Sequence, residues 1–585
     1  MMTTLQQHWR RYLLLVLTVG LTCVFSESAQ RHKRRGKLSE RTRIEAGRRG
    51  ADKVEVMVRF KNRPGITERA LVAGSGGQVR RSFRSSRWMA LRLPARVVAK
   101  MADNPNIEFI GPNETVTANM DLAKAVAGAA PVTANESALK GAGVTIAVVD
   151  SGVALHPEIG TLVAAVDFTG NGASNPNPQD APQNSSDPFG HGTHVAGIMV
   201  GNGSHSAEAK HAGIAPEANL VSVRVLGDNG AGQASDVMAG LQWIADHKDQ
   251  FGIRVVNLSL GHPAYESADD DPLVQAVEEL WDAGIVVVCS AGNNGRSGDA
   301  NVTSPCNSRK VITVGAINDR NTLDPSDDTV ASYSSRGPTR GDLVAKPDLA
   351  APGNRIVSLR AAGSLLDTQF PDRRVAADPG HPDVFEHIEM SGTSMASPMV
   401  AATAALMLQQ DPTLNPGTIK ARLMLSARKV QVGNPFATGA GTLDILAALR
   451  ATGQVTQALS PRLTPNALTG NLGVENTAVL WGDTLFSLDT TWAASVLWAD
   501  GTVWSDPVVW STGVRLPAVT GTLPPIVWPD ADLWPDADLW PDADLWPDTF
   551  LLPDADLWPD ADLWPDADLW PDADLWPDAT LIPDN

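Results

Sequence analysis

The chain has 585 residues, about four times the length of a typical single domain, so it should contain at least two folded parts. Its 43% hydrophobic and 19% charged residues are typical of a globular protein and exclude disorder throughout. The net charge of −19 comes mostly from residues 528–585, which contain 17 Asp and no Glu, Lys or Arg, leaving −2 for the rest. The acidity therefore belongs to a tail and does not indicate a nucleic-acid partner.

Residues 1–29 have the order of a secretory signal peptide. Basic residues within 8–11 precede an apolar run at 12–25, and small or polar residues follow. The run is too short to span a membrane comfortably, so we expect an exported chain with no membrane span after cleavage. The alternatives are a buried helix in the mature protein or a lipid anchor on Cys23.

Two cysteines remain after that cleavage, Cys289 and Cys306. In an exported chain they can form a disulfide, but free thiols also pack well as small core residues. The sequence leaves both arrangements open.

A basic linker and a small α+β domain are expected next. Residues 30–50 contain nine Lys or Arg against two Glu and have little apolar content, which indicates a solvated linker. Residues 51–118 alternate between strand-like and helical patterns. The expected strands are 54–60, 87–94 and 107–113, and the expected helix is 96–105.

Residues 119–455 have the pattern of a parallel sheet with helices on both faces. Five apolar, β-branched runs predict strands at 144–150, 218–226, 253–261, 285–293 and 310–317. Helical patterns lie between several of them, including 234–248 and 270–284. Strands that are apolar on both faces and alternate with helices indicate an α/β fold. Active sites of such sheets lie beyond the carboxyl ends of the strands.

A six-residue repeat, Trp-Pro-Asp-Ala-Asp-Leu, fills the C-terminal region. Eight tryptophans follow this spacing from Trp528 to Trp576, and a weaker form extends back to Phe486. We therefore separate a linker at 456–485 from a repeat tail at 486–585. A solenoid would need Pro at its corners and screening of the carboxylates, whereas an extended chain needs neither. Both forms stay open, and we expect a binding, spacing or attachment role with an unknown partner.

Three segments carry the groups needed for nucleophilic catalysis. A buried strand ends at Asp150, a glycine-rich turn places His191 at a helix start, and Ser394 precedes an Ala-rich helix. Taken singly, Asp150 could be a turn residue, Ser394 a helix cap, and His191 with His194 a metal-binding pair. Acyl transfer needs a hydroxyl, an imidazole and an orienting carboxylate. Because all three occur at junctions of one parallel sheet, we expect them to meet.

A fourth segment offers a hydrogen-bond donor. Asn293 follows another buried strand, and its amide can donate to an oxyanion. The alternative is an Asn that tolerates a left-handed turn, which suits Asn294 better because Gly295 follows it.

These motifs resemble those of the subtilisin-like serine proteases, the subtilase (peptidase S8) family. The matches are VVDSGV at Asp150, GHGTHVAG at His191, SAGNNG at Asn293 and SGTSMASP at Ser394, in the family's order. Supporting motifs lie at 257–261, 334–338, 346–353 and 439–444. Together they cover about 330 residues.

The resemblance implies a secreted serine endopeptidase acting on protein or peptide substrates through an acyl-enzyme intermediate. Ser394 would be the nucleophile, His191 the general base and then acid, and Asp150 the group that orients His191. The Asn293 side chain and the Ser394 backbone N–H would form the oxyanion hole. This chemistry requires no cofactor. Substrate would add as a β-strand along two segments, Ser259-Leu260-Gly261 and Ser290-Ala291-Gly292.

The resemblance also implies that residues 51–118 are an inhibitor-like propeptide, the enzyme's own intramolecular inhibitor. The Asn-rich calcium loop of the family is missing after the His191 helix, so a structural Ca²⁺ ion is compatible with the family but its ligands are not assignable. An insert at 361–389 precedes the nucleophile and could reshape one wall of the cleft.

Two alternative functions stay open. One is an inactive protease scaffold with a binding or surface-assembly role through the repeats. The fact that all four catalytic positions are intact argues against it. The other is a metal-dependent hydrolase using His191 and His194.

Overall fold

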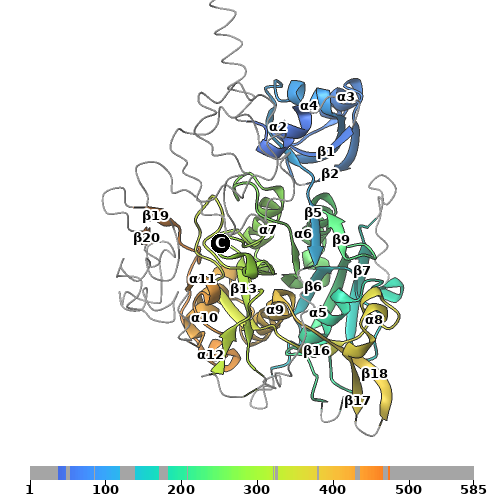
Figure 1. Ribbon diagram of the computed structural model, residues 1–585, viewed down its shortest axis with the longest axis vertical. Coiled ribbons are helices and arrows are strands. Elements are labelled where there is room, and N and C mark those ends of the chain that lie inside the picture. The colour runs from blue at the N-terminus through green and yellow to red at the C-terminus, as the bar shows by residue number, and fades with distance from the viewer. Residues whose placement is uncertain are drawn as a thin grey trace, which may run out of the picture.

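The computed structural model describes residues 37–47, 53–84, 86–118, 139–169, 182–206, 209–320, 322, 327–378, 381–428, 435–465 and 472–474. The expected signal peptide and repeat tail lie outside these ranges. Figure 1 shows a small N-terminal domain, drawn in blue, above a larger body that holds the main sheet. No helix in the described ranges has the length and apolar character needed to cross a membrane.

The N-terminal domain has four antiparallel strands. They are β1 (Lys53–Phe60), β2 (Gln78–Ser82), β3 (Trp88–Pro94) and β4 (Ile107–Pro112), in the order β2-β3-β1-β4. Its helices are α3 (Ile66–Gly74) and α4 (Ala95–Met101). The three expected strands and the expected helix are present. The sequence did not reveal β2, because its QVRRS segment is polar and only partly buried.

Residues 37–47 are not the solvated linker that their charge predicted. They contain helix α2 (Glu40–Gly47), and Leu38 forms a parallel bridge to Ile110 of β4. Ser39 and Thr42 are buried. The prediction failed because it rested on the total charge of residues 30–50. The contacts with the domain are made by individual residues, among them Leu38, Ser39 and Thr42.

The larger body is built on an eight-stranded, mainly parallel sheet. Its strands are β6 (Thr145–Asp150), β7 (Thr161–Asp167), β8 (Asn219–Arg224), β10 (Ile253–Leu258), β12 (Val286–Ser290), β13 (Ile312–Asn318), β14 (Thr329–Val330) and β15 (Leu349–Pro352). The order is β14-β13-β12-β10-β6-β8-β7, with β15 also paired to β13. All five expected strands are present, and only β14 is antiparallel to its neighbour.

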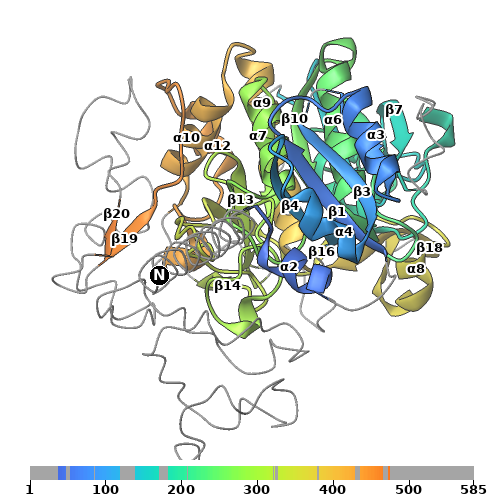
Figure 2. The same cartoon turned by 90° about the horizontal axis from the view of Figure 1, so that it is seen from above.

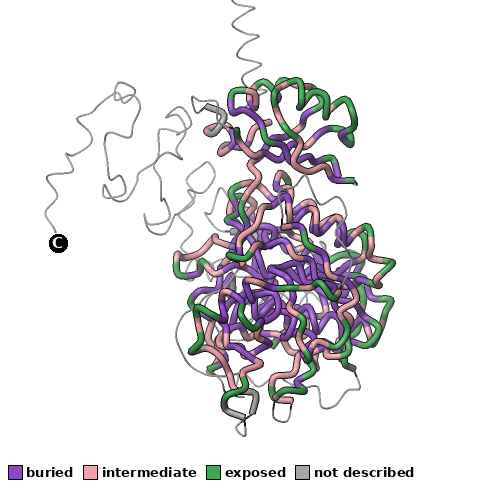
Figure 3. The backbone as a smooth tube through the Cα atoms, turned by 90° about the vertical axis from the view of Figure 1, so that its right-hand side faces the viewer, coloured by how far each residue is buried: buried purple, intermediate pink, exposed green. Residues whose placement is uncertain are grey.

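Helices cover both faces of this sheet, as the sequence predicted. Helices α5 (His191–Val200) and α9 (Thr393–Gln410) pack together on one face, and α6 (Ala234–Phe251) and α7 (Pro272–Asp282) pack on the other. Helices α10 (Pro416–Ser426), α11 (Pro435–Thr438) and α12 (Ile445–Arg450) complete the body. Figure 3 shows that the centre of the larger body is buried.

The insert before Ser394 is folded. It contains α8 (Leu365–Gln369), β17 (Arg374–Asp378) and most of β18 (His381–Met390), and β18 pairs with β16 (Ile356–Leu359). The backbone N–H groups of Leu365 and Leu366 donate to the carbonyls of Pro188 and Phe189, directly before His191. The insert therefore supports the loop that leads into α5.

The first residues of the expected 456–485 linker pack on the larger body. Ser460 Oγ lies 2.6 Å from the Asp348 carboxylate and 2.8 Å from Lys420 Nζ, and all three residues are buried. Burial lowers the pKa of Lys420 to about 7. This buried polar cluster fixes the chain at Ser460, beyond the last helix.

Candidate active site

Asp150 and His191 form a buried pair. Asp150 is the last residue of β6, and His191 is the first residue of α5. The Asp150 Oδ1 atom lies 2.8 Å from His191 Nδ1 and accepts the Ser151 backbone N–H at 2.7 Å. Both side chains are fully buried. A carboxylate in this position fixes the orientation of the imidazole and leaves Nε2 as the atom that can accept a proton.

Two glycines allow β6 and α5 to approach this closely. A Cβ at Gly192 would overlap the carbonyl oxygen of Gly152, and a Cβ at Gly152 would overlap the carbonyl oxygen of Ser186. Gly152 also has a positive φ of 108°, which side chains rarely adopt. The glycines of the VVDSGV and GHGTHVAG motifs are thus required by backbone proximity.

Asp187 was not predicted, although it holds the start of α5. Its Oδ1 accepts the Gly190 N–H at 2.7 Å and the Ser151 hydroxyl at 2.8 Å, and its Oδ2 accepts the Thr193 N–H at 2.8 Å. Burial raises the pKa of this carboxyl group, and these hydrogen bonds oppose the rise. An acidic residue four positions before His191 was the available signal, because acceptors at helix starts bind free N–H groups.

Ser394 is the second residue of α9 and is buried beside Ser259, which lies between β10 and Leu260. The Ser394 hydroxyl donates to the Ser259 carbonyl at 3.0 Å, and the Ser259 hydroxyl donates to the Ser394 carbonyl at 2.9 Å. Nε2 of His191 is buried and has no hydrogen-bond partner among the described residues. The acceptor atom of the imidazole is therefore available for a proton.

Asn293 is oriented by Thr393, a residue that the sequence did not single out. The Asn293 Oδ1 atom accepts the Thr393 N–H at 3.0 Å and the Thr393 hydroxyl at 2.9 Å. Because both contacts are made to the oxygen, the amide nitrogen points away from Thr393. Nδ2 is buried and lacks a partner in the described part of the chain, which is the arrangement expected of a donor awaiting an oxyanion.

His194 does not form a metal-binding pair with His191. Its Nε2 lies 3.1 Å from the Ile356 carbonyl and 3.0 Å from the Ile388 carbonyl, so this nitrogen is the protonated donor. Burial, followed by the nearby His191, lowers the pKa of His194 to about 3. Across the described ranges, no group of three or more His, Cys, Asp or Glu residues is arranged to hold a metal ion.

The segment at Leu260, one of the two expected substrate segments, pairs with an extended strand of the same chain. Strand β5 (Thr115–Ala118) pairs antiparallel with β11 (Leu260–Gly261) on one side and with β9 (Ala231–Gln233) on the other. Val116 is buried, whereas Thr115 and Thr117 are exposed. Two strands of the larger body therefore enclose the end of the N-terminal domain.

The second expected substrate segment, 290–292, makes its backbone bonds within the larger body. Ala291 pairs with Val314 and Thr303, and the Gly292 N–H donates to Thr393 Oγ1. Cys289, directly before this segment, forms a disulfide with Cys306, with 5.8 Å between their Cα atoms. Of the two arrangements left open by the sequence, the structure has the paired one.

An α/β sheet with a buried carboxylate–imidazole pair, and with a serine at the start of a neighbouring helix, is the framework of a serine hydrolase. Residues 141–441 match the model of the subtilase family. The chain belongs to this family and is a subtilisin-like serine endopeptidase.

Relatives and solved structures agree with this result. Serine protease AprX of Bacillus subtilis (strain 168) is 39% identical over 357 residues, which cover 60% of this chain and 76% of AprX. Subtilisin DY of Bacillus licheniformis is 32% identical over 310 residues, covering 53% and 92%. The structure of fervidolysin from Fervidobacterium pennivorans, a keratinolytic enzyme related to subtilisin, has a TM-score of 0.53 at 22% identity. The matched region covers 71% of this chain and 63% of fervidolysin, and the likeness is one of fold.

Proposed function

We propose that the chain is an exported endopeptidase that hydrolyses peptide bonds with Asp150, His191, Ser394 and Asn293. The observation that carries the proposal is the 2.8 Å contact between Asp150 and His191, with Nε2 of the imidazole left without a partner in the described residues. The proposal of export rests on the signal-peptide pattern of residues 1–29.

In the proposed reaction, the Ser394 hydroxyl turns from the Ser259 carbonyl to His191 Nε2. The imidazole takes the proton as Ser394 Oγ attacks the peptide carbonyl, and Asp150 stabilises the resulting imidazolium. The Asn293 amide and the Ser394 backbone N–H donate to the oxyanion. His191 then protonates the leaving amine, and water, activated by the same imidazole, releases the acyl group from Ser394.

We further propose that the N-terminal domain is a propeptide that inhibits the enzyme before maturation. Figure 2 looks down on this domain, which lies over α6 and α7. Part of the interface is polar. Arg81 Nε donates to Asp236 at 2.9 Å, and Asn113 Nδ2 donates to Ser235 Oγ at 3.0 Å.

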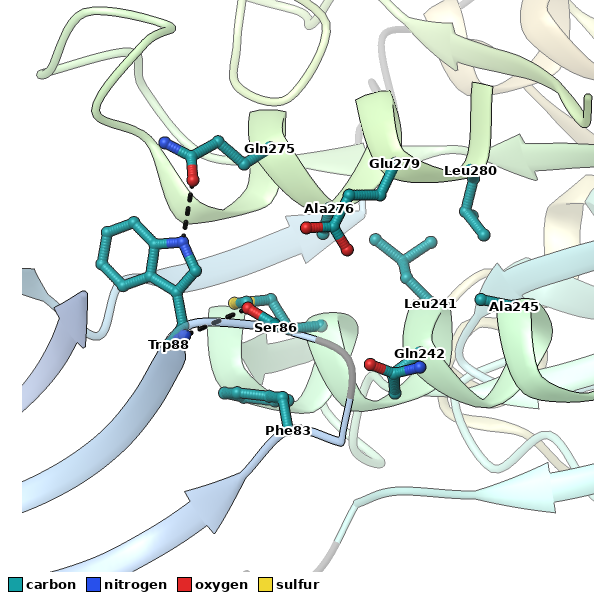
Figure 4. Close-up of a pocket in the computed structure, with 11 residues that line it drawn as sticks. Phe83, Ser86, Trp88, Leu241, Gln242, Ala245, Gln275, Ala276, Glu279 and Leu280 are labelled. Atoms are coloured by element: carbon teal, nitrogen blue, oxygen red, sulfur yellow. Dashed lines mark hydrogen bonds between the residues drawn. The ribbon is translucent and has the colours of Figure 1, made fainter. Parts of the chain in front are cut away.

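The apolar part of this interface is closely packed. In Figure 4, Phe83 and Trp88 of the N-terminal domain face Leu241 and Ala276 across a pocket of about 20 Å³, and Trp88 Nε1 donates to Gln275 at 2.9 Å. A volume of this size holds about one water molecule. The domain thus fits α6 and α7 with little empty space, which supports a stable inhibitory complex.

Strand β5 supports the inhibitory role most directly. It pairs with the segment at Leu260, one residue from Ser259, whose carbonyl accepts the Ser394 hydroxyl. A peptide substrate would need the same pairing positions. We therefore expect self-cleavage shortly after Ala118, within residues 119–130.

Replacing Ser394 by Ala tests both parts of the proposal. The variant should not cleave a peptide substrate, and purified precursor should stay uncut, because Ser394 is the nucleophile of the proposed reaction. Ser426→Ala, at the end of α10, is the control and should mature like the wild type. Peptide cleavage by Ser394→Ala would refute the catalytic assignment, and unaided maturation of that variant would refute self-cleavage. Mass spectrometry of the secreted protein would define both mature ends.

The repeat tail is proposed to bind, space or attach the enzyme outside the catalytic reaction. The support is its composition, since no step of peptide hydrolysis uses a ladder of Trp and Asp.

A further inference from the structure

We propose that residues 37–47 form a latch that holds the propeptide on the enzyme at the point where β5 begins. This rests on the proposed function of the N-terminal domain as a propeptide. The segment that binds the enzyme surface is residues 37–47 of the same chain. These residues belong to the basic run, which has no role in catalysis, and the proposal gives them a role in holding the propeptide.

The latch is fixed to the N-terminal domain through the edge of β4. The Ser39 N–H donates to the Ile110 carbonyl at 2.9 Å, and the Ile110 N–H donates to the Lys37 carbonyl at 2.8 Å. Lys37 Nζ also donates to the Asn104 carbonyl at 2.9 Å. These contacts continue the sheet beyond β4 and bring α2 next to the end of that strand.

Arg41 joins the two bodies. One of its nitrogens, Nη1, donates to both oxygens of Glu114 at 3.1 Å, and Glu114 directly precedes β5. The guanidinium carbon lies 4.9 Å from the centroid of the Tyr265 ring, a cation–π distance. Tyr265 follows β11, the strand that pairs with β5. The Glu114 carbonyl in turn accepts the Ala234 N–H at 2.7 Å.

The surface beside Tyr265 is acidic and complements the latch. Burial raises the pKa of Glu266 to about 7, and the charges of Asp271, Asp270 and Glu114 add to the effect. A hydrogen bond from Ser39 of the latch opposes this rise in the pKa of Glu266. Ser39 therefore gives the latch a second contact with this surface, beside that of Arg41 with Tyr265.

The latch acts on release of the propeptide, and its loss leaves the mature enzyme unchanged. Arg41 lies in the part that is removed, so the mature enzyme from an Arg41→Ala precursor has the same sequence as the wild type. Differences between the two precursors therefore report the propeptide complex alone. The Arg41–Glu114 pair lies within the removed part, so only the exposed cation–π contact crosses to the mature enzyme, and its loss corresponds to about a 2- to 5-fold faster release.

The test uses the full chain with Ser394 intact. Purified precursor is allowed to cleave itself and is then diluted, and the onset of activity on a short chromogenic peptide is followed. Arg41→Ala and Tyr265→Ala should each shorten the lag about 2- to 5-fold, and the double variant should add little to either, because both remove the same cation–π contact. Arg92→Ala, whose side chain is paired with Glu55 inside the N-terminal domain, should keep the wild-type lag.

Two results would overturn the latch, and they differ in what else they refute. An unchanged lag in both Arg41→Ala and Tyr265→Ala would refute the latch while leaving the propeptide proposal intact. Wild-type activity with no lag at all would refute the propeptide proposal and the latch with it. If Arg41→Ala precursor fails to fold, Tyr265→Ala decides alone, since Tyr265 is 47% exposed and outside the N-terminal domain.

Discussion

Replacing Thr393 by Val should lower turnover by disturbing the orientation of the Asn293 amide. The Thr393 hydroxyl donates to Asn293 Oδ1 at 2.9 Å, and the backbone N–H of the same residue donates at 3.0 Å. Valine has nearly the same shape. It removes the hydroxyl bond to Asn293 and also the bond that Thr393 Oγ1 accepts from the Gly292 N–H at 3.2 Å. The Asn293 side chain then has one contact instead of two to keep its nitrogen directed at the oxyanion.

The magnitude of the part that acts through Asn293 follows from the loss of the one hydroxyl bond to its Oδ1 atom. A net value of about 0.5–1.5 kcal/mol corresponds to about a 2- to 13-fold decrease in kcat. The KM for a peptide should change little, because β9 and β11 provide the pairing positions and contain neither residue. Removing the donor itself, in Asn293→Ala, should cost on the order of 10²- to 10³-fold in kcat; that range is the one known for subtilisin and is not worked out from this structure.

A double-mutant cycle separates this role from general destabilisation. If Thr393 acts through Asn293, Thr393→Val should have a smaller effect on kcat in the Asn293→Ala background, where only the lost bond to Gly292 remains. Thr403→Val is a matched control, because the hydroxyl of this buried threonine of α9 donates to the Met399 carbonyl at 2.7 Å within the same helix. Equal decreases in kcat for Thr393→Val in both backgrounds would refute the reasoning, as would a similar decrease in Thr403→Val.

Three further predictions concern the interface, the motif glycines and the tail. Burial raises the pKa of Glu266 from 4.5 to about 7, although a hydrogen bond from Ser39 opposes the rise, so the folded precursor binds this proton more tightly than the unfolded chain and should lose stability as pH rises from about 4.5 through 7; Glu266→Gln should flatten this dependence in thermal unfolding, and an unchanged profile would contradict it. Gly192→Ala should unfold the site and abolish maturation, because its Cβ would overlap the Gly152 carbonyl; normal thermal stability and activity would count against this. Deleting residues 475–585 should leave kcat/KM for a short peptide within about twofold, as expected when the removed part contacts no substrate, and a large loss would place the domain boundary elsewhere.

Much of the fold could be predicted from the sequence because the pattern of a parallel sheet is local. Strands such as β6 and β12 are apolar on both faces, so each is recognisable without knowledge of its neighbours. Segments with weaker patterns were missed for the same reason. Strand β7 is only partly buried, and β2 is polar, so neither carries a continuous apolar signal.

The catalytic groups were also recognisable in the sequence, since each lies in a motif whose small residues are required where two backbones come together. Gly152 and Gly192 are examples, because a Cβ at Gly152 would overlap the Ser186 carbonyl and one at Gly192 would overlap the Gly152 carbonyl. The proposed reacting groups therefore lie in short motifs that can be found in the sequence, and the combination of the motifs indicates the chemistry.

The contacts among these segments were decided only by the tertiary structure. Thr393 orients Asn293 across 100 residues of sequence, and Arg41 reaches Tyr265 across more than 200. Neither residue has a local pattern that marks it, because a threonine before a serine and an arginine in a basic run are ordinary in sequence. Hydrogen bonds and cation–π contacts depend on distances of a few ångströms, and such distances between remote residues exist only once the sheet has brought their elements together.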